Sequence, residues 1–264
     1  MTVSRSLADA VRAEQAKLPP SIGDVLRDNI GMAPTTPADR LRVERPADVE
    51  MPQASRFRAA RFEQAVPAQY SRATLENFAT PSPLLTAKLK LARRYVEEWP
   101  ARRSNERFPQ LVIFFGETGT GKTHLAYAMA RAVAQGNECE PTVVSFATVI
   151  RELRSTWRRN AGDAHEAQVL QRYHSAPLLV LDEISSHALY GEPWQHLYDV
   201  VAPREADLRP TILITNEREG AMETLLGPAI SSRVARYGGP WDFGTFDRRR
   251  GAEIPRVTHT ITTR

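Results

Sequence analysis

The chain has 264 residues, of which 42% are hydrophobic and 25% charged, the size and balance of a soluble globular protein with one large core or two small domains. No apolar run is long enough to span a bilayer and the N-terminus has no apolar signal core, so we expect a cytoplasmic protein without membrane contact. The single cysteine, Cys139, excludes an internal disulfide and a multi-cysteine zinc site, while the net charge of +4 permits nucleic-acid binding without establishing it.

Two short helices are predicted in residues 1–31. Ser6 and Ser21 each precede an aspartate by three residues, a capping-box pattern that satisfies the free amides of a first helical turn. An apolar stripe follows the second box and ends at Gly31; its members are Ile22, Val25, Leu26 and Ile30. Helices this short need a partner against which to bury that stripe. We therefore predict a small helical module that binds a partner.

The next segment, residues 32–68, contains five prolines, mixed charges and little periodicity. This composition predicts a partly disordered linker. From residue 69 to residue 264 the chain becomes regular and is predicted to form one domain. Its first long helix begins after Ser82, which suits an N-cap, with Pro83 at the first helical position. Apolar residues then recur at helical spacing at Leu85, Leu89, Ala92, Val96 and Trp99.

Strands and helices alternate through the rest of this domain. Apolar runs predict strands at 111–115, 142–146, 177–181 and 211–215. Helical periodicity predicts helices after residue 123 and at 147–158, 164–173 and 193–201. Alternation of this kind predicts an α/β fold in which helices cover both faces of a parallel sheet.

The sequence GETGTGKT, residues 116–123, lies between a predicted buried strand and a predicted helix. Its glycines let successive amide N–H groups and the helix N-terminus point at the β-phosphate of a nucleotide. In such a loop Lys122 reaches the β- and γ-phosphates and the Thr123 hydroxyl ligates magnesium. A flexible loop that carries Gly-Lys-Thr by chance is the alternative, and the flanking strand and helix favour the phosphate loop. The predicted nucleotide-binding residues are Gly116, Glu117, Thr118, Gly119, Thr120, Gly121, Lys122, Thr123 and His124.

Polar side chains follow two later strands at the carboxyl edge of the predicted sheet, where a nucleotide binds. LLVLDEI ends in Asp182, which is expected to hold magnesium, and Glu183, which is expected to polarise the attacking water. An acidic pair after a strand is often only surface charge, but the phosphate loop upstream favours a hydrolytic site. Asn216 follows the strand TILIT and either bridges the water and the γ-phosphate or merely tolerates a turn.

The phosphate loop, the strand ending in Asp-Glu and the strand ending in Asn, in this order, resemble the AAA+ ATPases. Four segments narrow the resemblance: PAQYSRATLENF, LLVLDEI, RPTILITNE and LLGPAISSRV. They look like the DnaC-type loaders of bacterial replicative helicases and are similar to the related IstB-type transposition ATPases. The resemblance spans about residues 66–246.

This resemblance implies that residues 69–264 form a P-loop AAA+ ATPase domain. Such a domain binds ATP and Mg²⁺, hydrolyses ATP at sites completed between subunits, and therefore self-associates. The implied partners are a replicative DnaB-type helicase and the single-stranded DNA onto which it is loaded. An IstB-like ATPase that regulates a transposase on duplex DNA is the alternative. A nucleotide-gated binding module with little turnover is a third possibility, against which Glu183 argues.

The resemblance also assigns arginines. Arg233, in SSRV, falls where the family places its arginine finger, a cation that enters a neighbouring subunit's site. Arg204 aligns with a second interfacial arginine. Only about thirty residues follow Arg233, too few for the helical lid that carries a sensing arginine in many AAA+ proteins. We therefore expect a core without a full lid, and the three arginines at 248–250 are either a cis sensor or a surface tail.

The predicted helix at 147–158 has two faces. Val149, Ile150, Leu153 and, in phase with them, Trp157 are expected to be buried. Arginines occupy another face, and in the resembling loaders this region lines the path of single-stranded DNA. A solvated basic face is the alternative interpretation. The candidate DNA-binding residues are Arg151, Arg154, Arg158 and Arg159.

Overall fold

The computed structural model describes residues 53–102, 105, 108–136, 139–158, 163–185, 193–248 and 252–253. The predicted N-terminal module and the linker up to residue 52 lie outside this part, as does Arg159. In the described part of the chain, no helix combines the length and apolar character that crossing a membrane requires.

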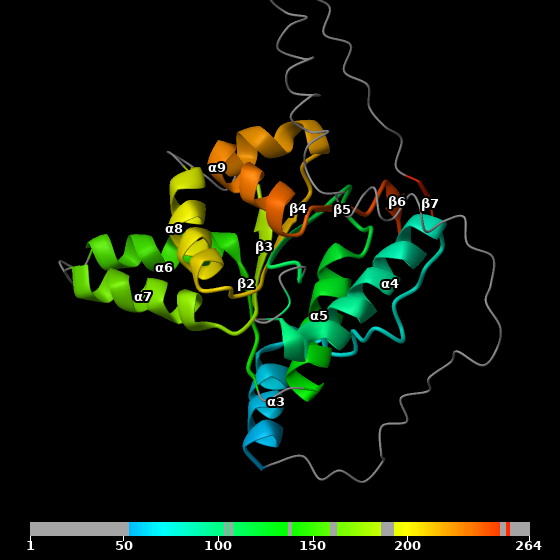
Figure 1. Cartoon of the computed structure of the whole chain (residues 1–264), viewed down its shortest axis with the longest axis horizontal. Coiled ribbons are helices and arrows are strands. Elements are labelled where there is room, and N and C mark those ends of the chain that lie inside the picture. The colour runs from blue at the N-terminus through cyan, green and yellow to red at the C-terminus, as the bar shows by residue number, and fades with distance from the viewer. Residues whose placement is uncertain are drawn as a thin grey trace, which may run out of the picture. The chain divides into compact units, whose positions relative to one another are not determined.

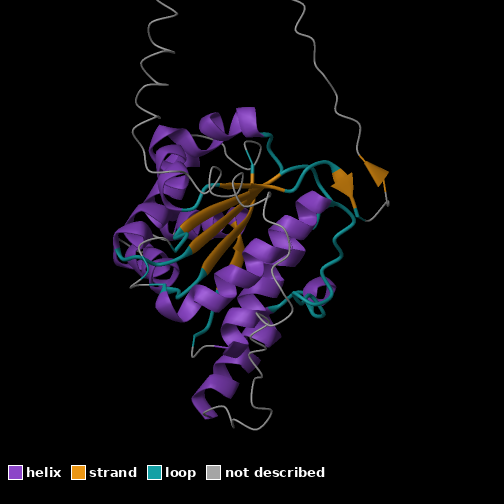
Figure 2. Ribbon diagram, turned by 45° about the vertical axis from the view of Figure 1, so that its right-hand side comes forward, coloured by secondary structure: helices purple, strands orange, loops and turns teal. Residues whose placement is uncertain are grey.

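A five-stranded parallel sheet forms the centre of the domain (Figures 1 and 2). Its strand order is β2-β3-β4-β1-β5. The α/β fold predicted from the alternation of elements is confirmed. Strands β1 and β4 are buried at every position, as expected for runs of Val, Ile, Leu and Phe that are covered on both faces. The strands are β1 (Leu111–Phe115), β2 (Thr142–Ser145), β3 (Leu179–Ile184), β4 (Thr211–Thr215) and β5 (Pro240–Asp242).

Two helical layers cover the sheet, and successive strand residues face them alternately. In β1, Val112 and Phe114 belong to the core cluster on the side of α4 and α5, while Leu111 and Ile113 belong to the cluster on the side of α6 to α9. The first layer contains α3 (Gln53–Ala65), α4 (Pro83–Glu98) and α5 (Lys122–Gly136). The second contains α6 (Phe146–Arg158), α7 (Asp163–Ser175), α8 (Pro193–Ala206) and α9 (Met222–Tyr237).

Helix α4 begins where the sequence predicts. The Ser82 side chain accepts a hydrogen bond from the Leu85 amide at 3.3 Å, and Pro83 occupies the first turn. Leu85, Ala92 and Tyr95 are buried along one face. Trp99, also buried, begins the short 3₁₀ turn η4 (Trp99–Ala101).

The structure differs from the expected linker over residues 53–68. Residues 53–65 form α3, and Phe62 is buried in the core cluster that includes α5. Glu63 forms a bidentate ion pair with Arg131 of α5, with N···O distances of 2.6 and 2.8 Å. A second 3₁₀ turn, η3 (Ala68–Tyr70), follows. The contacts that order this helix come from residues distant in sequence, so the weak local periodicity gave no sign of them.

The end of the domain is built from strands. After α9, which is kinked at Gly227 (φ 71°), β5 adds to the free edge of β1. Trp241 of β5 stacks on Phe114 with ring centroids 5.0 Å apart. A short antiparallel pair follows, β6 (Phe246–Asp247) with β7 (Ala252–Glu253). Among the described residues after α9 there is no further helix.

Candidate nucleotide-binding site

The loop between β1 and α5 has the backbone conformation of an anion-binding cradle. Gly116, Gly119 and Gly121 have φ values of 128°, 84° and 100°, in the left-handed region that favours glycine. Helix α5 then begins at Lys122, so its N-terminal amides face the same side as the loop. The three glycines that the sequence singles out are therefore the positions at which the backbone turns.

A cleft of about 960 Å³ opens above this loop, at the carboxyl edge of the sheet. The structure brings together there most of the residues predicted from sequence. The loop contributes Thr118, Gly119, Gly121, Lys122, Thr123 and His124, and the strand ends contribute Asp182, Glu183 and Asn216. Thr120 is instead buried beneath the loop, where its hydroxyl donates to the Glu117 carbonyl at 2.9 Å.

The Lys122 ammonium lies against its own loop. It donates to the carbonyls of Gly116 and Glu117 at 2.7 and 2.8 Å, and the side chain is almost wholly buried. Burial lowers the pKa of Lys122 to about 8, and the nearby carboxylates of Asp182, Glu117 and Asp242 oppose this shift. The cation is thus held at the floor of the cleft.

Thr123 and Asp182 present two oxygen atoms side by side. The Thr123 hydroxyl donates to Asp182 Oδ1 at 3.4 Å, and the same oxygen accepts the Glu183 amide at 2.8 Å. Burial raises the pKa of the Asp182 carboxyl, while these hydrogen bonds act in the opposite direction. No cluster of three or more His, Cys, Asp or Glu ligands occurs in the described part of the chain. One hydroxyl and one carboxylate fit Mg²⁺, which takes its remaining ligands from water and phosphate.

Glu183 has an unusual backbone. Its φ is 57°, and the register of β3 against β4 shifts between Leu181 and Ile184, which marks a bulge. In a regular strand, successive side chains point to opposite faces, whereas here both Asp182 and Glu183 line the cleft. A left-handed conformation costs a non-glycine residue on the order of 1–3 kcal/mol, and such strain clusters at functional sites.

Asn216 lines the cleft immediately after β4, with an exposed side chain. The preceding Thr215 is fully buried, and its hydroxyl accepts the Glu217 amide at 3.0 Å, so the strand ends in a fixed turn. The amide of Asn216 is therefore presented next to the two acids of β3.

One wall of the cleft comes from the segment that precedes α4, which sequence reasoning did not assign to the site. Tyr70 lines the cleft and stacks on Tyr127 of α5 at 4.6 Å. Arg131 fastens this segment, because it donates to the carbonyls of Ser71 and Ala73 as well as to Glu63. The sequence motif PAQYSRATLENF covers these residues, and it was the signal from which this wall of the cleft could have been predicted. Its other cleft-lining neighbours are Gln69, Ala79, Thr80 and Pro81.

His124 joins this wall to the loop. Its Nε2 lies 3.1 Å from Asn77 Oδ1, and its ring meets Phe78 edge-on. Burial and the neighbouring charge of Arg248 lower the pKa of His124, so the ring is neutral at physiological pH. His124 lines the cleft beside residues 77–78, which the sequence did not connect with it, and its role in nucleotide binding stays a prediction.

A match to a family model identifies the protein family of this chain. The model of the IstB-like ATP binding proteins matches residues 90–231, which include the phosphate loop, both acids of β3 and Asn216. The chain belongs to this family. The resemblance to the DnaC/IstB-type AAA+ proteins is thereby confirmed.

Relatives of this IstB-like protein include the "Replicative helicase loader DnaC" of Escherichia coli strain K12, which is 27% identical over 181 residues, 69% of this chain and 70% of the relative. The "Uncharacterized protein YdaV" of the same strain is 34% identical over 128 residues, 48% of this chain and 50% of the relative. Among solved structures, "Crystal structure of the DnaC helicase loader" matches with a TM-score of 0.57 and 21% identity, covering 67% of this chain and 99% of that one. An AMPPCP-bound DnaA from Aquifex aeolicus matches with a TM-score of 0.53 and 17% identity, covering 68% of this chain and 53% of that one. These structures share the P-loop AAA+ fold.

In this IstB-like protein Arg233 lies on α9, outside the residues that line its own cleft. Its Nε donates to Glu205 of α8, and its guanidinium lies over the Tyr198 ring at 5.2 Å. A further hydrogen bond runs to the Ala229 carbonyl at 3.3 Å. The side chain is 29% exposed, so the guanidinium is partly open to solvent.

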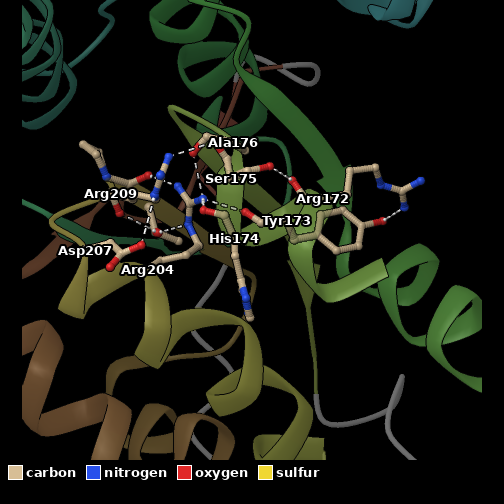
Figure 3. Close-up of polar contacts among 10 residues, drawn as sticks. Arg172, Tyr173, His174, Ser175, Ala176, Arg204, Asp207 and Arg209 are labelled. Carbon is tan, nitrogen blue, oxygen red and sulfur yellow. Dashed lines mark hydrogen bonds and ion pairs between the residues drawn. The ribbon is translucent and has the colours of Figure 1, made fainter. Parts of the chain in front are cut away.

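Arg204 is not at the surface, and its interpretation as an interfacial arginine is wrong. The side chain is fully buried, and Figure 3 shows its guanidinium among backbone carbonyls. Burial lowers the pKa of Arg204 to about 9, which still leaves it charged at neutral pH. Its acceptors are the carbonyls of Tyr173, His174, Ala176 and Pro210 and the Thr211 hydroxyl.

Helix α6 has the two faces that its sequence predicts. Val149, Ile150 and Leu153 are buried. Arg151 is exposed and donates to the Thr148 hydroxyl at 2.9 Å, while Arg154 is half-buried. The side chains of Trp157 and Arg158 lie outside the described part, so their predicted roles stay predictions.

Proposed function

We propose that this protein is an ATP-dependent loader of a bacterial or phage replicative ring helicase onto single-stranded DNA. The observation that carries the proposal is the similarity to the E. coli helicase loader DnaC, which extends over 70% of that relative. The fold shared with a solved DnaC helicase loader agrees with it. The cleft supports the ATP-binding part of the proposal, because a phosphate loop, two acids and an asparagine converge there.

In this proposal the loop amides and Lys122 bind the β- and γ-phosphates of ATP. Thr123 and Asp182 would hold Mg²⁺, which would supply positive charge beside the phosphates. Glu183 accepts a proton from the attacking water, and Asn216 orients that water towards the γ-phosphate. The bulge at Glu183 supports its separate role, because it lets adjacent acids reach the same cleft.

Arg233 supports a site that is completed between subunits. Its guanidinium is held by Glu205 on the surface formed by α8 and α9 of its own chain. In the proposal, self-association lets Arg233 exchange Glu205 for the γ-phosphate in a neighbour's cleft. The guanidinium is 29% exposed, and the exchange replaces one anionic partner by another, so the charge stays paired throughout.

Hydrolysis is tested by Glu183→Gln, with Lys122→Ala for comparison. The Gln variant is expected to bind ATP with the parent affinity and to lose turnover, because the phosphate loop and Asp182 stay intact while the water loses its base. Lys122→Ala is expected to weaken binding itself. A Gln variant that turns over ATP at the parent rate rules out this role for Glu183.

The partner is tested by co-purification with the cognate DnaB-type helicase. Deletion of residues 1–50 removes the predicted N-terminal module but keeps α3, whose Glu63 pairs with Arg131. We expect the truncated chain to bind ATP but no longer to co-purify with the helicase. Leu26→Asp, in the predicted apolar stripe, is expected to do the same, while Leu41→Asp, in the segment predicted to be a linker, serves as the matched control. Retention of the helicase by the truncated chain contradicts the docking role of this module.

A second candidate function is supported by the family match to IstB-like ATP binding proteins. In that case the chain is an ATPase that regulates a transposase on duplex DNA. The same co-purification separates the two functions. An intact chain that ignores the helicase and associates with a transposase on duplex DNA favours this second function.

A further inference from the structure

A tight turn at residues 72–77 precedes α4, and the Asn77 side chain closes it. Its Nδ2 donates to the Arg72 carbonyl, and its Oδ1 accepts the Thr74 amide at 2.9 Å. In return, the Asn77 amide donates to the Thr74 hydroxyl at 3.2 Å. These bonds fix the orientation of the side-chain amide, because exchanging its oxygen and nitrogen would set donor against donor and acceptor against acceptor.

The same oxygen of Asn77 meets His124, which lies in the first turn of α5. The distance from His124 Nε2 to Asn77 Oδ1 is 3.1 Å. Since an amide oxygen only accepts, His124 must carry its proton on Nε2 and donate it. Burial and the charge of Arg248 lower the pKa of His124, so the neutral ring is the form that makes this bond. The helical turn that begins with Lys122 and Thr123 is thereby hydrogen-bonded to the turn before α4.

Packing around Phe78 supports this alignment. Phe78 is buried, and the His124 ring meets it edge-on with ring centroids 5.7 Å apart. The Arg248 guanidinium lies over the Phe78 ring at 4.4 Å. Arg248 is itself fixed to the phosphate loop, because its amide donates to the Gly119 carbonyl at 3.0 Å. Phe78 therefore contacts both the start of α5 and the segment after β5.

Contacts of different strength hold the wall of the cleft that precedes α4. At residues 71–73 the buried Arg131 donates to several backbone carbonyls. At Asn77 the bond to His124 is single and exposed to solvent. Residues 79–81, which line the cleft, follow directly after it. The bond between Asn77 and His124 is therefore the contact whose loss would release this part of the wall without disturbing the interior.

The side chains that this wall presents to the cleft carry no charge. They belong to Gln69, Tyr70, Ala79, Thr80 and Pro81. An uncharged wall in the same cleft as an anion-binding loop suits the nucleoside part of a nucleotide whose phosphates lie on the loop.

We propose that Asn77 and His124 are positioning residues for nucleotide binding, whose hydrogen bond holds residues 79–81 at the distance from the phosphate loop that a nucleotide spans. The inference rests on the proposed ATP binding and adds to it a pair that acts through the wall of the cleft. In it, His124 acts through Asn77 rather than by touching the nucleotide. A wall that is held in place before binding raises affinity, because no binding energy is spent on ordering it.

The test measures equilibrium affinities for ATP with magnesium and for tripolyphosphate, by displacement of a fluorescent nucleotide. His124→Phe keeps a ring against Phe78 but loses the donor. It is expected to weaken ATP binding about three- to tenfold, the effect of one neutral hydrogen bond. Tripolyphosphate affinity should not change, because this ligand has no nucleoside part to meet the wall. His124→Gln should keep most of the ATP affinity, since its side-chain N–H can replace Nε2–H.

A double-mutant cycle shows whether the two residues act through their bond. Asn77→Ala should weaken ATP binding in the parent chain and clearly less in the His124→Phe background. Asn105→Ala is the matched control and should keep the parent affinity, since it removes a side-chain amide that bonds to Glu98 at the end of α4. If Asn77→Ala does not fold, because it also opens the turn at residues 72–77, His124→Phe and His124→Gln carry the test.

Four results overturn the inference on its own. They are parent ATP affinity in His124→Phe, equal losses for ATP and tripolyphosphate, equal losses in His124→Phe and His124→Gln, and an Asn77→Ala loss that is the same in both backgrounds. A parent chain that binds no ATP overturns the proposed function together with this inference. Loss of ATP affinity alone in His124→Phe and its recovery in His124→Gln, at an unchanged thermal midpoint, support it.

Discussion

Two arginines on opposite sides of helix α8 have different surroundings. On its inner side, Arg204 is fully buried and all its partners are acceptors of the domain interior. On its outer side, the next residue, Glu205, holds Arg233 of α9 at a surface where the guanidinium is partly exposed. Backbone carbonyls in an interior cannot be exchanged for a ligand, whereas a carboxylate at a surface can. The partners of a buried arginine therefore indicate a structural role, and those of Arg233 leave a functional role open to it.

The largest effect that sharpens this comparison is expected for Arg233→Ala. If Arg233 acts in a neighbouring subunit, turnover should fall roughly a thousandfold or more while ATP affinity stays nearly unchanged. Steady-state ATPase assays and equilibrium binding measure the two quantities. Mixing this variant with Lys122→Ala should restore some turnover, because some interfaces then combine an intact phosphate loop from one subunit with an intact Arg233 from the other. Absence of rescue in mixtures that co-assemble contradicts the role in trans.

Arg204→Ala tests the other side of α8. We expect a loss of about 3 kcal/mol or more in the free energy of unfolding, because buried carbonyls and Thr211 lose their donor. Urea denaturation measures this loss. The matched control is Arg209→Ala, whose guanidinium bonds to the Ser175 carbonyl near the surface and should cost less than about 1 kcal/mol. Equal losses of unfolding free energy in the two variants would contradict the distinction between a buried and a surface arginine.

The arginines of α6 extend the comparison to a helix surface. Replacing Arg151, Arg154 and Arg158 together by Ala should weaken single-stranded DNA binding and lower the slope of log affinity against log salt by roughly two. Fluorescence anisotropy over a salt series measures both quantities. The control replaces Lys90, Arg93 and Arg94 by Ala, which removes the same number of positive charges from the exposed face of α4. If both triple variants behave alike, the α6 stripe is only a solvated face.

The smallest effect is expected for Glu205→Gln. Gln keeps an acceptor for Arg233, which also keeps the Ala229 carbonyl and the Tyr198 ring, so loss of the ion pair should lower the free energy of unfolding by about 1 kcal/mol. ATP affinity of the isolated chain should not change. A thermal midpoint as low as that of Arg204→Ala would contradict the expected difference in stability between the α8–α9 surface and the interior.

Local patterns predicted the elements that organise the cleft. The apolar run 111–115 predicts β1, and the glycines after it predict the turning loop. Asp182 and Asn216 line the same cleft because the carboxyl ends of parallel strands share one edge. The left-handed backbone of Glu183 could not be predicted, since only the pairing of β3 with β4 produces the bulge.

Long-range contacts explain the remaining differences. The helix α3 depends on Arg131, far along the chain, and the strand β5 is short and contains a proline. Arg204 and Arg233 look alike in sequence because nothing local tells which side of α8 each will face. Only the packed structure separates a guanidinium that is enclosed by carbonyls from one that meets a glutamate and is partly open to solvent.

Backbone hydrogen bonds join Phe243, Gly244 and Arg248 to the phosphate loop and the end of β1, and they also set an order of events during translation. The loop leaves the ribosome before the segment that holds its outer side, which is synthesised about 120 residues later, at roughly 5–20 residues per second. The N-terminal residues emerge before either of them. The N-terminal residues of a nascent chain are therefore synthesised several seconds before the nucleotide cleft is complete, so any partner captured on the ribosome meets a chain whose cleft is still unfinished.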